Sequence, residues 1–361
     1  MTPISVIIVG APRSGTYWVV DLLQTRFGIH FPSETHFVPL YSRYLWLWGD
    51  LSIAANRRRL LKSIYEFLQI WTARSSSSSD YLVEIRRLSL LVTLDEGCSE
   101  EIVEKSSDYP SLVEALFWQF SEIQGADASG DKSAHYKVIE PELTFGLFPE
   151  ALMLHVIRDG RDVAMSWTRQ WFGPASIQDA ARLWRDHIEI NREWGRRNPS
   201  RYLEIRYEDL ATDKESKIRT MESFLGKSAF SDVGEGTQSD LAKALSKTES
   251  HSAMLNIKAA DNISKWRSQM LSEDVVHFEE IAGDTLAVCG YEVSVIGKSV
   301  RTRNTFPRLS MHLVRVAAKT ILPLFLGICS RLGFSVLTLV NRNYPAEWRK
   351  VMMSRTVNSR P

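Results

Sequence analysis

The chain has 361 residues, of which 44% are hydrophobic and 24% are charged, and this composition is typical of a folded globular protein and excludes global disorder. Its 44 basic and 43 acidic residues leave a formal net charge of +1, so we expect no nucleic-acid partner. The three cysteines lie far apart, which excludes a disulfide framework and a cysteine-based zinc site and favours a cytoplasmic location.

Three short runs of β-branched and apolar residues predict buried parallel strands, at Ile4–Val9, Ala151–Ile157 and Tyr202–Arg206. Each run leads into a helical pattern, and these patterns cover Thr16–Phe27, Asp162–Trp171, Tyr207–Leu210 and Lys214–Leu225. The alternation of strand, turn and helix predicts an α/β fold with a central parallel sheet flanked by helices. Ligands of such sheets bind beyond the carboxyl ends of the strands.

Residues 41–129 differ from this pattern, because they are rich in Trp, Leu and Arg at helical spacing. We expect a helical insertion on the acceptor side of one domain that covers residues 1–300, with a flexible loop at the serine run Ser75–Ser79. The first apolar run, Ile4–Val9, is too short for a secretory signal peptide, which agrees with a cytoplasmic location.

The segment 301–361 has a different composition, with 11 Lys or Arg and one acid, so its formal charge is +10 against −9 for residues 1–300. Arg315, Lys319 and Arg331 interrupt its apolar stretch, so we expect helices that lie along a surface rather than cross a bilayer. The alternatives are peripheral attachment to the anionic inner face of the membrane, packing on the acidic domain or in a homodimer, and a disordered tail.

The segment Gly10–Thr16 connects the first predicted strand to the first predicted helix and reads Gly-Ala-Pro-Arg-Ser-Gly-Thr. Backbone N–H groups at a helix start bind anions, and Gly15 allows the backbone to approach a ligand closely. Arg13 adds a fixed positive charge, and Ser14 and Thr16 add hydroxyl donors. The segment therefore predicts a phosphate site. The alternative is a strand–turn–helix corner that binds no ligand and contains an arginine by chance. Thr16 stands where a Walker A loop has lysine, which favours a phosphate-bearing donor other than ATP.

A second motif runs from His155 to Trp167, with Arg158 at the end of a predicted strand and Ser166 about two helical turns later. An arginine and a serine in this arrangement can converge on one further phosphate. The alternative is a solvated surface cluster of ion pairs formed by Arg158, Asp159, Arg161 and Asp162.

These motifs, with the Ile205–Leu210 segment and the later segments Asn262–Arg267 and Ala282–Tyr291, resemble the sulfotransferases that use 3′-phosphoadenylyl sulfate. The resemblance covers residues 4–292 in the expected order and implies a P-loop-like three-layer fold. It is closest to the branch of tyrosylprotein and carbohydrate sulfotransferases, because the phenol and steroid enzymes have a lysine where this chain has Arg13.

The resemblance also implies a role for individual residues in holding the donor. Four residues of the first loop would hold the 5′-phosphosulfate: Arg13, Ser14, Gly15 and Thr16. Tyr17, which follows them, would also belong to the donor site. Arg158 and Ser166 would hold the 3′-phosphate, Tyr207 would lie near the adenine, and Ser264 and Lys265 would complete the site. The product would be adenosine 3′,5′-bisphosphate, and no metal is implied.

The acceptor hydroxyl must lose a proton, and Glu34 is the first candidate for the general base. His36 and His135 are alternative bases, because His36 replaces the family's arginine and His135 is offset by one position from a catalytic histidine of the phenol-type enzymes. Lys132 matches a lysine that donates to the bridging oxygen, and Arg13 and Ser264 would stabilise charge in the transition state.

Two other functions compete with sulfuryl transfer. A P-loop nucleotide kinase is disfavoured by Thr16, and a non-catalytic binding module is disfavoured by the presence of both Glu34 and Lys132. The preferred acceptor is a hydroxyl of a carbohydrate or glycolipid in the cytoplasm, since membrane attachment through residues 301–361 would bring the site to lipid-linked acceptors.

Overall fold

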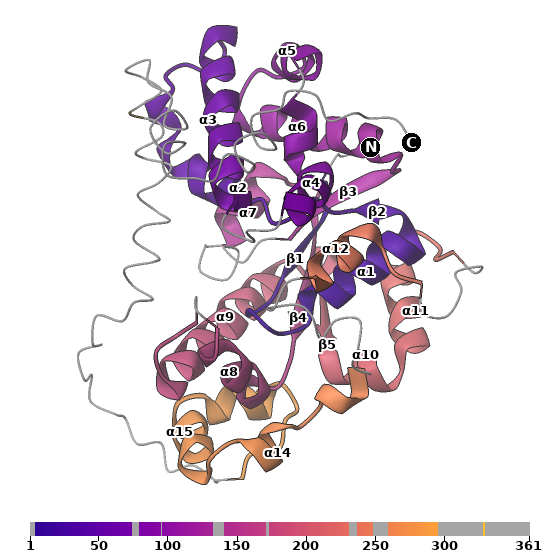
Figure 1. The fold of residues 1–361 in the computed structure, drawn as a ribbon. Helices are drawn as coiled ribbons and strands as arrows, with labels where there is room; N and C mark the ends of the chain where they lie inside the picture. The colour runs from indigo at the N-terminus through magenta and orange to yellow at the C-terminus, as the bar shows by residue number, and fades with distance from the viewer. Residues whose placement is uncertain are drawn as a thin grey trace.

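The fold is a mixed α/β structure around one parallel sheet (Figure 1). It is a computed structural model that describes residues 4–73, 79–94, 96–132, 141–170, 173–230, 237–247, 259–294 and 328. The strands of the sheet are β1 (Ile4–Val9), β2 (Ile29–His30), β3 (Ala128–Lys132), β4 (Leu152–Ile157) and β5 (Tyr202–Arg206). Their order is β2-β3-β1-β4-β5, and every pair of neighbours is parallel.

The helices connect and cover these strands. The α-helices are α1 (Thr16–Phe27), α2 (Phe37–Tyr41), α3 (Ala54–Ala73), α4 (Ser79–Arg87), α5 (Glu96–Glu104), α6 (Tyr109–Gln124), α7 (Pro141–Leu147), α8 (Gly160–Thr168), α9 (Ile177–Arg197), α10 (Tyr207–Thr212), α11 (Lys214–Leu225), α12 (Asp240–Ser246), α14 (Trp266–Gln269) and α15 (Ser272–Val288). The 3₁₀ helices are η1 (Ser42–Leu47), η2 (Leu90–Leu94), η4 (Pro199–Arg201) and η5 (Ala259–Asn262).

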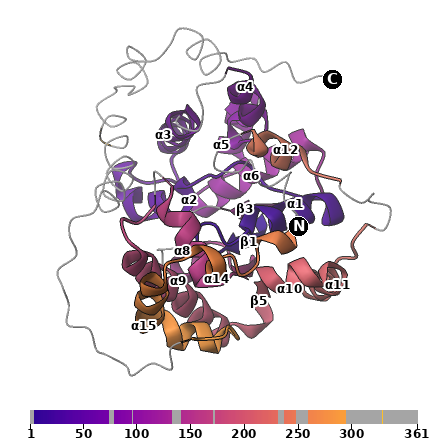
Figure 2. The same ribbon diagram turned by 60° about the horizontal axis from the view of Figure 1, so that its bottom comes forward.

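Two groups of helices lie at opposite ends of the molecule. Helices α3 to α6 gather at one end, whereas α8, α9, α14 and α15 lie together at the other (Figures 1 and 2). The sheet between them is apolar and buried, since Val6, Ile7 and Ile8 of β1 and Met153 and Leu154 of β4 have at most 1% of their surface exposed. Burial of such β-branched and apolar side chains on both faces is what a central parallel strand requires.

The expected α/β fold is confirmed, and the bounds of several elements differ by a few residues. The predicted strands at Ile4–Val9 and Tyr202–Arg206 and the helices at Thr16–Phe27 and Lys214–Leu225 have the predicted bounds. The helix expected at Asp162–Trp171 is instead Gly160–Thr168, because the Asp159 carboxylate accepts the N–H of Arg161 and caps an earlier start.

The structure adds two strands that the sequence patterns missed, β2 and β3. Strand β3 reads Ala-Ser-Gly-Asp-Lys, and it replaces the last two residues of the expected helical insertion 41–129. Its polar residues are satisfied internally, since both Asp131 oxygens accept from Thr35 Oγ1 at 3.0 Å. A Cβ on Gly130 would lie 2.4 Å from the Phe31 ring, so a larger residue does not fit there.

Before β3, the described residues of the segment 41–129 form η1, α3, α4, η2, α5 and α6, and the end of the serine run, Ser79, begins α4. The segment 301–361 and its expected helices lie outside the described residues, apart from the isolated residue 328, as does Ser75–Ser78. Among the described residues, no helix is both long enough and apolar enough to cross a membrane.

Candidate functional site

The carboxyl ends of the strands bring the predicted site residues to one edge of the sheet. The Gly10–Thr16 loop follows β1, and Glu34 comes four residues after the end of β2. Lys132 ends β3, Arg158 follows β4, and Tyr207 follows β5. Every strand therefore supplies a predicted site residue at or soon after its carboxyl end, which is where ligands bind in parallel sheets.

The loop after β1 presents the start of α1 as an anion site. Gly15 is the N-cap residue with φ 87°, and no described side chain caps the helix there. Ser14 has 1% of its surface exposed, and its hydroxyl has no hydrogen-bond partner among the described residues. A helix start without a side-chain cap and an unpaired buried hydroxyl together fit an anion that is bound at this point.

Gly15 is required for a second reason, which is the closeness of Tyr207. A Cβ on Gly15 would lie 2.5 Å from Cδ2 of Tyr207, well inside van der Waals contact. The Tyr207 ring also packs edge-on against Trp18 of α1, with ring centroids 5.4 Å apart. The residue that follows β5 therefore packs directly on the loop that follows β1.

Arg13 and Arg158 meet beside this loop, although both are cationic. Arg13 Nε donates to Ser166 Oγ at 2.9 Å, and Arg158 Nη1 donates to the backbone oxygen of Arg13 at 3.1 Å. Burial lowers the pKa of Arg13, and the charge of Arg158 lowers that pKa further. Two partly buried guanidinium groups that repel each other are stabilised by an anion between them. The first and second sequence motifs thus form one site.

Arg158 also reaches the segment that precedes α14. Its Nη2 donates to the backbone oxygen of Asn262 at 2.6 Å, and its guanidinium lies 4.7 Å from the Tyr207 ring centroid. Lys265 Nζ donates to Asn262 Oδ1 at 2.7 Å. Ser264, in the same segment, has a left-handed φ of 54°. The predicted residues Tyr207, Ser264 and Lys265 therefore lie with Arg158 in one neighbourhood.

Asp162 anchors this segment, a role that the sequence analysis missed. Its Oδ1 accepts the backbone N–H of Trp266 at 2.8 Å, and its Oδ2 lies 3.9 Å from Arg158 Nη2. Burial raises the pKa of Asp162 to about 6, although the Trp266 N–H and Arg158 both act to lower it. The spacing of four residues between Arg158 and Asp162, about one helical turn, was the available signal for the contact between these two residues.

The alternative of a solvated surface cluster does not hold, because Asp159, Arg161 and Asp162 are all buried. Arg161 is buried, and it pairs with Asp159 at 2.8 Å and with Glu279 of α15 at 2.6 Å. The Trp266 ring centroid lies 3.6 Å from the Arg161 guanidinium carbon. Arg161 therefore joins α8 to α14 and α15, and its buried charge is fully paired, as burial requires.

Glu34 is held between two basic residues that come from different parts of the chain. Lys132 Nζ pairs with Oε1 of Glu34, and His36 Nε2 lies 2.8 Å from Oε2. Burial alone would raise the pKa of Glu34, but Lys132 and then His36 outweigh burial, so the pKa lies well below its usual range. The carboxylate is thus ionised, oriented and 21% exposed.

Tyr17 completes this group from the first turn of α1. Lys132 Nζ lies 3.8 Å from the centre of the Tyr17 ring, and the Tyr17 hydroxyl hydrogen-bonds to Glu34. Burial, followed by the charge of Glu34, raises the pKa of Tyr17 well above its usual range, so the phenol stays protonated and donates. Lys132 and Glu34 therefore lie directly beside the start of α1.

The residues with strained backbones coincide with the predicted site. Among the described residues, the non-glycine residues with positive φ are Arg13 at 74°, His36 at 57° and Ser264 at 54°. Such strain persists only where the surrounding structure enforces it, and it is common at functional sites. The remaining predicted base, His135, lies outside the described residues.

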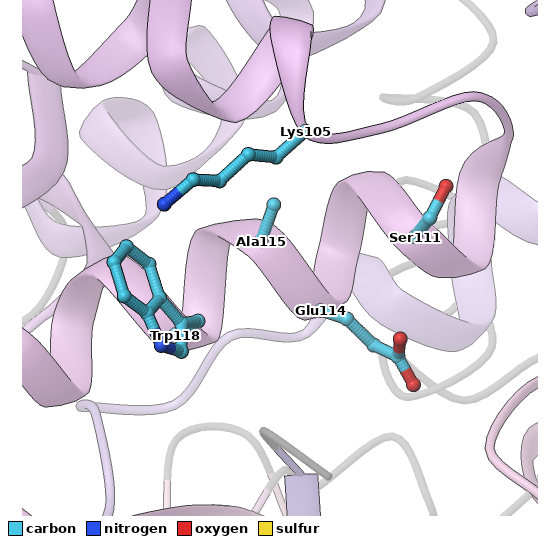
Figure 3. Close-up of a pocket in the computed structure, with 5 residues that line it drawn as sticks. All are labelled: Lys105, Ser111, Glu114, Ala115 and Trp118. Atoms are coloured by element: carbon cyan, nitrogen blue, oxygen red, sulfur yellow. The ribbon is translucent and has the colours of Figure 1, made fainter. Parts of the chain in front are cut away.

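A pocket of about 330 Å³ lies elsewhere, and no predicted site residue lines it. It is formed by Lys105, Ser111, Glu114, Ala115 and Trp118, with the Lys105 ammonium over the Trp118 ring (Figure 3). Within the described parts of the chain, no group of three or more His, Cys, Asp or Glu residues is arranged to hold a metal ion.

Comparison with known proteins places these features in a family context. The profile of a family described as "Sulfotransferase family" matches residues 3–232. A sulfotransferase domain of the olefin synthase of Synechococcus PCC 7002 is similar in structure, with a TM-score of 0.51 and 20% identity over 78% of this chain and 95% of that domain. A sulfotransferase domain from the curacin biosynthetic pathway has a TM-score of 0.53 and 17% identity over 81% of this chain and 100% of that domain. No curated protein sequence matches the chain.

Proposed function

Because the chain belongs to the sulfotransferase family, we propose that it moves a sulfuryl group from 3′-phosphoadenylyl sulfate to an acceptor hydroxyl. The observation that carries this proposal is the meeting of Arg13 and Arg158 beside the start of α1, which no described side chain caps. A nucleotide with phosphate at both its 3′ and 5′ positions brings negative charge to both parts of such a site.

The residues at the site fit this donor. Arg13 and the residues Ser14 to Tyr17 hold the 5′-phosphosulfate, and the buried unpaired hydroxyl of Ser14 gains an acceptor there. Arg158 and Ser166 hold the 3′-phosphate, for which the unpaired Arg158 Nε is a further donor. Tyr207 lies near the adenine, and Ser264 and Lys265 close the donor site from the segment before α14.

Catalysis follows from the pair Glu34 and Lys132. The donor supplies an activated sulfuryl group with adenosine 3′,5′-bisphosphate as its leaving group. Glu34 takes the proton of the acceptor hydroxyl while the new oxygen–sulfur bond forms and the sulfur–oxygen bond to the phosphate breaks. Lys132, Arg13 and Ser264 stabilise the negative charge that develops on the departing phosphate. Basic side chains and loop N–H groups supply the counter-charge in this proposal, so it requires no metal ion.

His36 positions the base in this account and does not replace it. Its side chain is 0% exposed and lies against Glu34, so Glu34 is the member of the pair that an acceptor can approach. This arrangement supports a mechanism of the tyrosylprotein and carbohydrate type, in which a carboxylate is the base. The acceptor is a hydroxyl of a carbohydrate or glycolipid, and the basic and apolar segment 301–361 holds the protein near a membrane that carries such acceptors.

The experiment that tests this function is isothermal titration with adenosine 3′,5′-bisphosphate and with ATP, each with and without magnesium. We expect the bisphosphate to bind in magnesium-free buffer, because side chains and loop N–H groups supply the counter-charge. Binding of ATP that requires magnesium, without binding of the bisphosphate, would favour a P-loop kinase instead.

A further inference from the structure

The two oxygens of the Glu34 carboxylate have different partners. The imidazole on Oε2 belongs to His36, which is completely buried and follows Glu34 by two residues, so this contact is fixed within one loop. The ammonium on Oε1 belongs to Lys132, at the end of a strand 98 residues away, and its long flexible side chain is 10% exposed. Of the two contacts, the one to Lys132 is the one that can exchange.

The Lys132 ammonium also lies close to the start of α1, where an anion of the donor would bind. Lys132 is paired in register with Ile8 of β1, just before the loop that leads to this helix. Its ammonium lies over the ring of Tyr17, which immediately follows Thr16 in the first turn of α1. The Lys132 ammonium thus contacts both the Glu34 carboxylate and the first turn of α1. Its flexible four-carbon side chain lets it turn from the carboxylate toward an anion bound at the helix start.

The contact with Lys132 also makes Glu34 unsuited to act as a base. While the ammonium covers Oε1, that oxygen is not available to an acceptor hydroxyl, and the lowered pKa of Glu34 weakens its basicity. Removal of Lys132 leaves the carboxylate still held by His36 through Oε2 and by the Tyr17 hydroxyl, and it takes the ammonium away from Oε1. The orientation of the base therefore does not depend on the contact that is lost.

We propose that Glu34 and the anionic 5′ group of the donor compete for the Lys132 ammonium, so that donor binding uncovers Oε1 of Glu34 and prepares the base. This inference rests on the proposed function. While Lys132 pairs with Glu34 the base is covered, and under this proposal acceptor activation therefore follows donor binding. Because binding free energies are reciprocal, loss of the Glu34 charge must in turn favour binding of the donor's anion.

The test is a double-mutant cycle on affinity for adenosine 3′,5′-bisphosphate, measured by titration calorimetry at low salt without magnesium. Glu34→Gln removes the competing charge and keeps the size of the side chain. We expect this variant to bind the bisphosphate about 3–10-fold more tightly than the wild-type protein. In a Lys132→Gln background, the same substitution should change the affinity less than about twofold, since no ammonium is left to compete for.

Two results would overturn the proposal. The first is unchanged or weaker binding by Glu34→Gln in the wild-type background. The second is an equal gain in both backgrounds, which would mean that Glu34 acts only by long-range repulsion of the anion. Failure of the wild-type protein to bind the bisphosphate would instead refute the proposed function, and the two failures are therefore distinguishable.

A measurement on the wild-type protein removes the dependence on variants that fold poorly. The Nζ resonance of Lys132, in protein labelled with ¹⁵N-lysine and assigned by comparison with Lys132→Gln, reports the partner of this ammonium. We expect this resonance to shift when the bisphosphate is titrated in. A resonance that stays in place at saturation with the bisphosphate would contradict the exchange.

Discussion

Replacement of Gly15 by alanine tests the packing of the loop after β1 on the residue that follows β5. Gly15 has a φ of 87°, which alanine rarely adopts, and the added Cβ would lie 2.5 Å from Cδ2 and 2.8 Å from Cε2 of Tyr207. Neither ring atom belongs to the flexible end of a side chain. The ring itself is held by Trp18 and by Arg158.

The cost of this substitution has two parts, and the structure offers a control for each. The left-handed conformation costs alanine about 1–2 kcal/mol. Overpacking against the Tyr207 ring adds about 1–3 kcal/mol. Gly226 has a similar φ of 61° but has no other atom within 4 Å of an added Cβ, so Gly226→Ala should show the first cost alone.

The assay is urea unfolding of both variants and of Gly15→Ala in a Tyr207→Ala background. In the wild-type background we expect Gly15→Ala to lower the free energy of unfolding by about 2–5 kcal/mol. In the Tyr207→Ala background, where the ring is absent, Gly15→Ala should cost no more than Gly226→Ala does. Equal losses for Gly15→Ala and Gly226→Ala in the wild-type background would refute the close packing of Tyr207 on this loop.

Three further predictions concern the base Glu34, the residue Asp162 that anchors the segment before α14, and the C-terminal segment 301–361. Glu34→Gln should retain bisphosphate binding but lower turnover about 10²–10⁴-fold in a transfer assay with ³⁵S-labelled donor and lipid or glycan extracts, and a rate near that of the wild type would assign the base to His36 or His135. The pKa of Asp162 is raised to about 6 from its usual 3.8. Protonated Asp162 therefore adds its full contribution to the free energy of unfolding below about pH 4, and this contribution is lost as the pH rises through 6. Asp162→Asn should therefore reduce the loss of unfolding free energy between pH 4 and pH 7 by up to about 3 kcal/mol in urea titrations, and parallel pH curves for the two proteins would contradict this. The full-length protein should float with anionic vesicles at low salt and be released at high salt, and protein that stays at the bottom of the gradient at low salt would exclude the membrane role of residues 301–361.

The strands and the loop that carry the strongest patterns could be predicted from the sequence. The apolar run Ile4–Val9 and the helix at Thr16–Phe27 have their predicted bounds, because a continuous β-branched run and a glycine at each end of the helix leave few alternatives. The contact between the Arg13 and Arg158 motifs agrees with the general rule that strand ends in a parallel sheet share one edge.

Other features could not be predicted, because they depend on long-range contacts. Strand β3 has no apolar pattern that would mark it as a strand. Its Asp131 can be buried only because it accepts hydrogen bonds from Thr35, which is 96 residues away. The pairing of Glu34 with Lys132 spans 98 residues, and nothing local in either segment indicates it. The anchoring of the Trp266 backbone by Asp162 likewise depends on the position of a loop that follows more than a hundred residues later.

The affinity for adenosine 3′,5′-bisphosphate relative to adenosine 5′-phosphate, in magnesium-free buffer, measures directly whether the site binds two phosphate groups of the donor. We expect the 3′-phosphate to strengthen binding by about 10–150-fold, the value of a charge-assisted contact of about 1.5–3 kcal/mol. Arg158→Ala should lose most of this preference. Arg58→Ala, which breaks a half-exposed ion pair with Glu100, should keep it. Equal affinities for the two nucleotides in the wild-type protein would contradict a donor site with two phosphate positions.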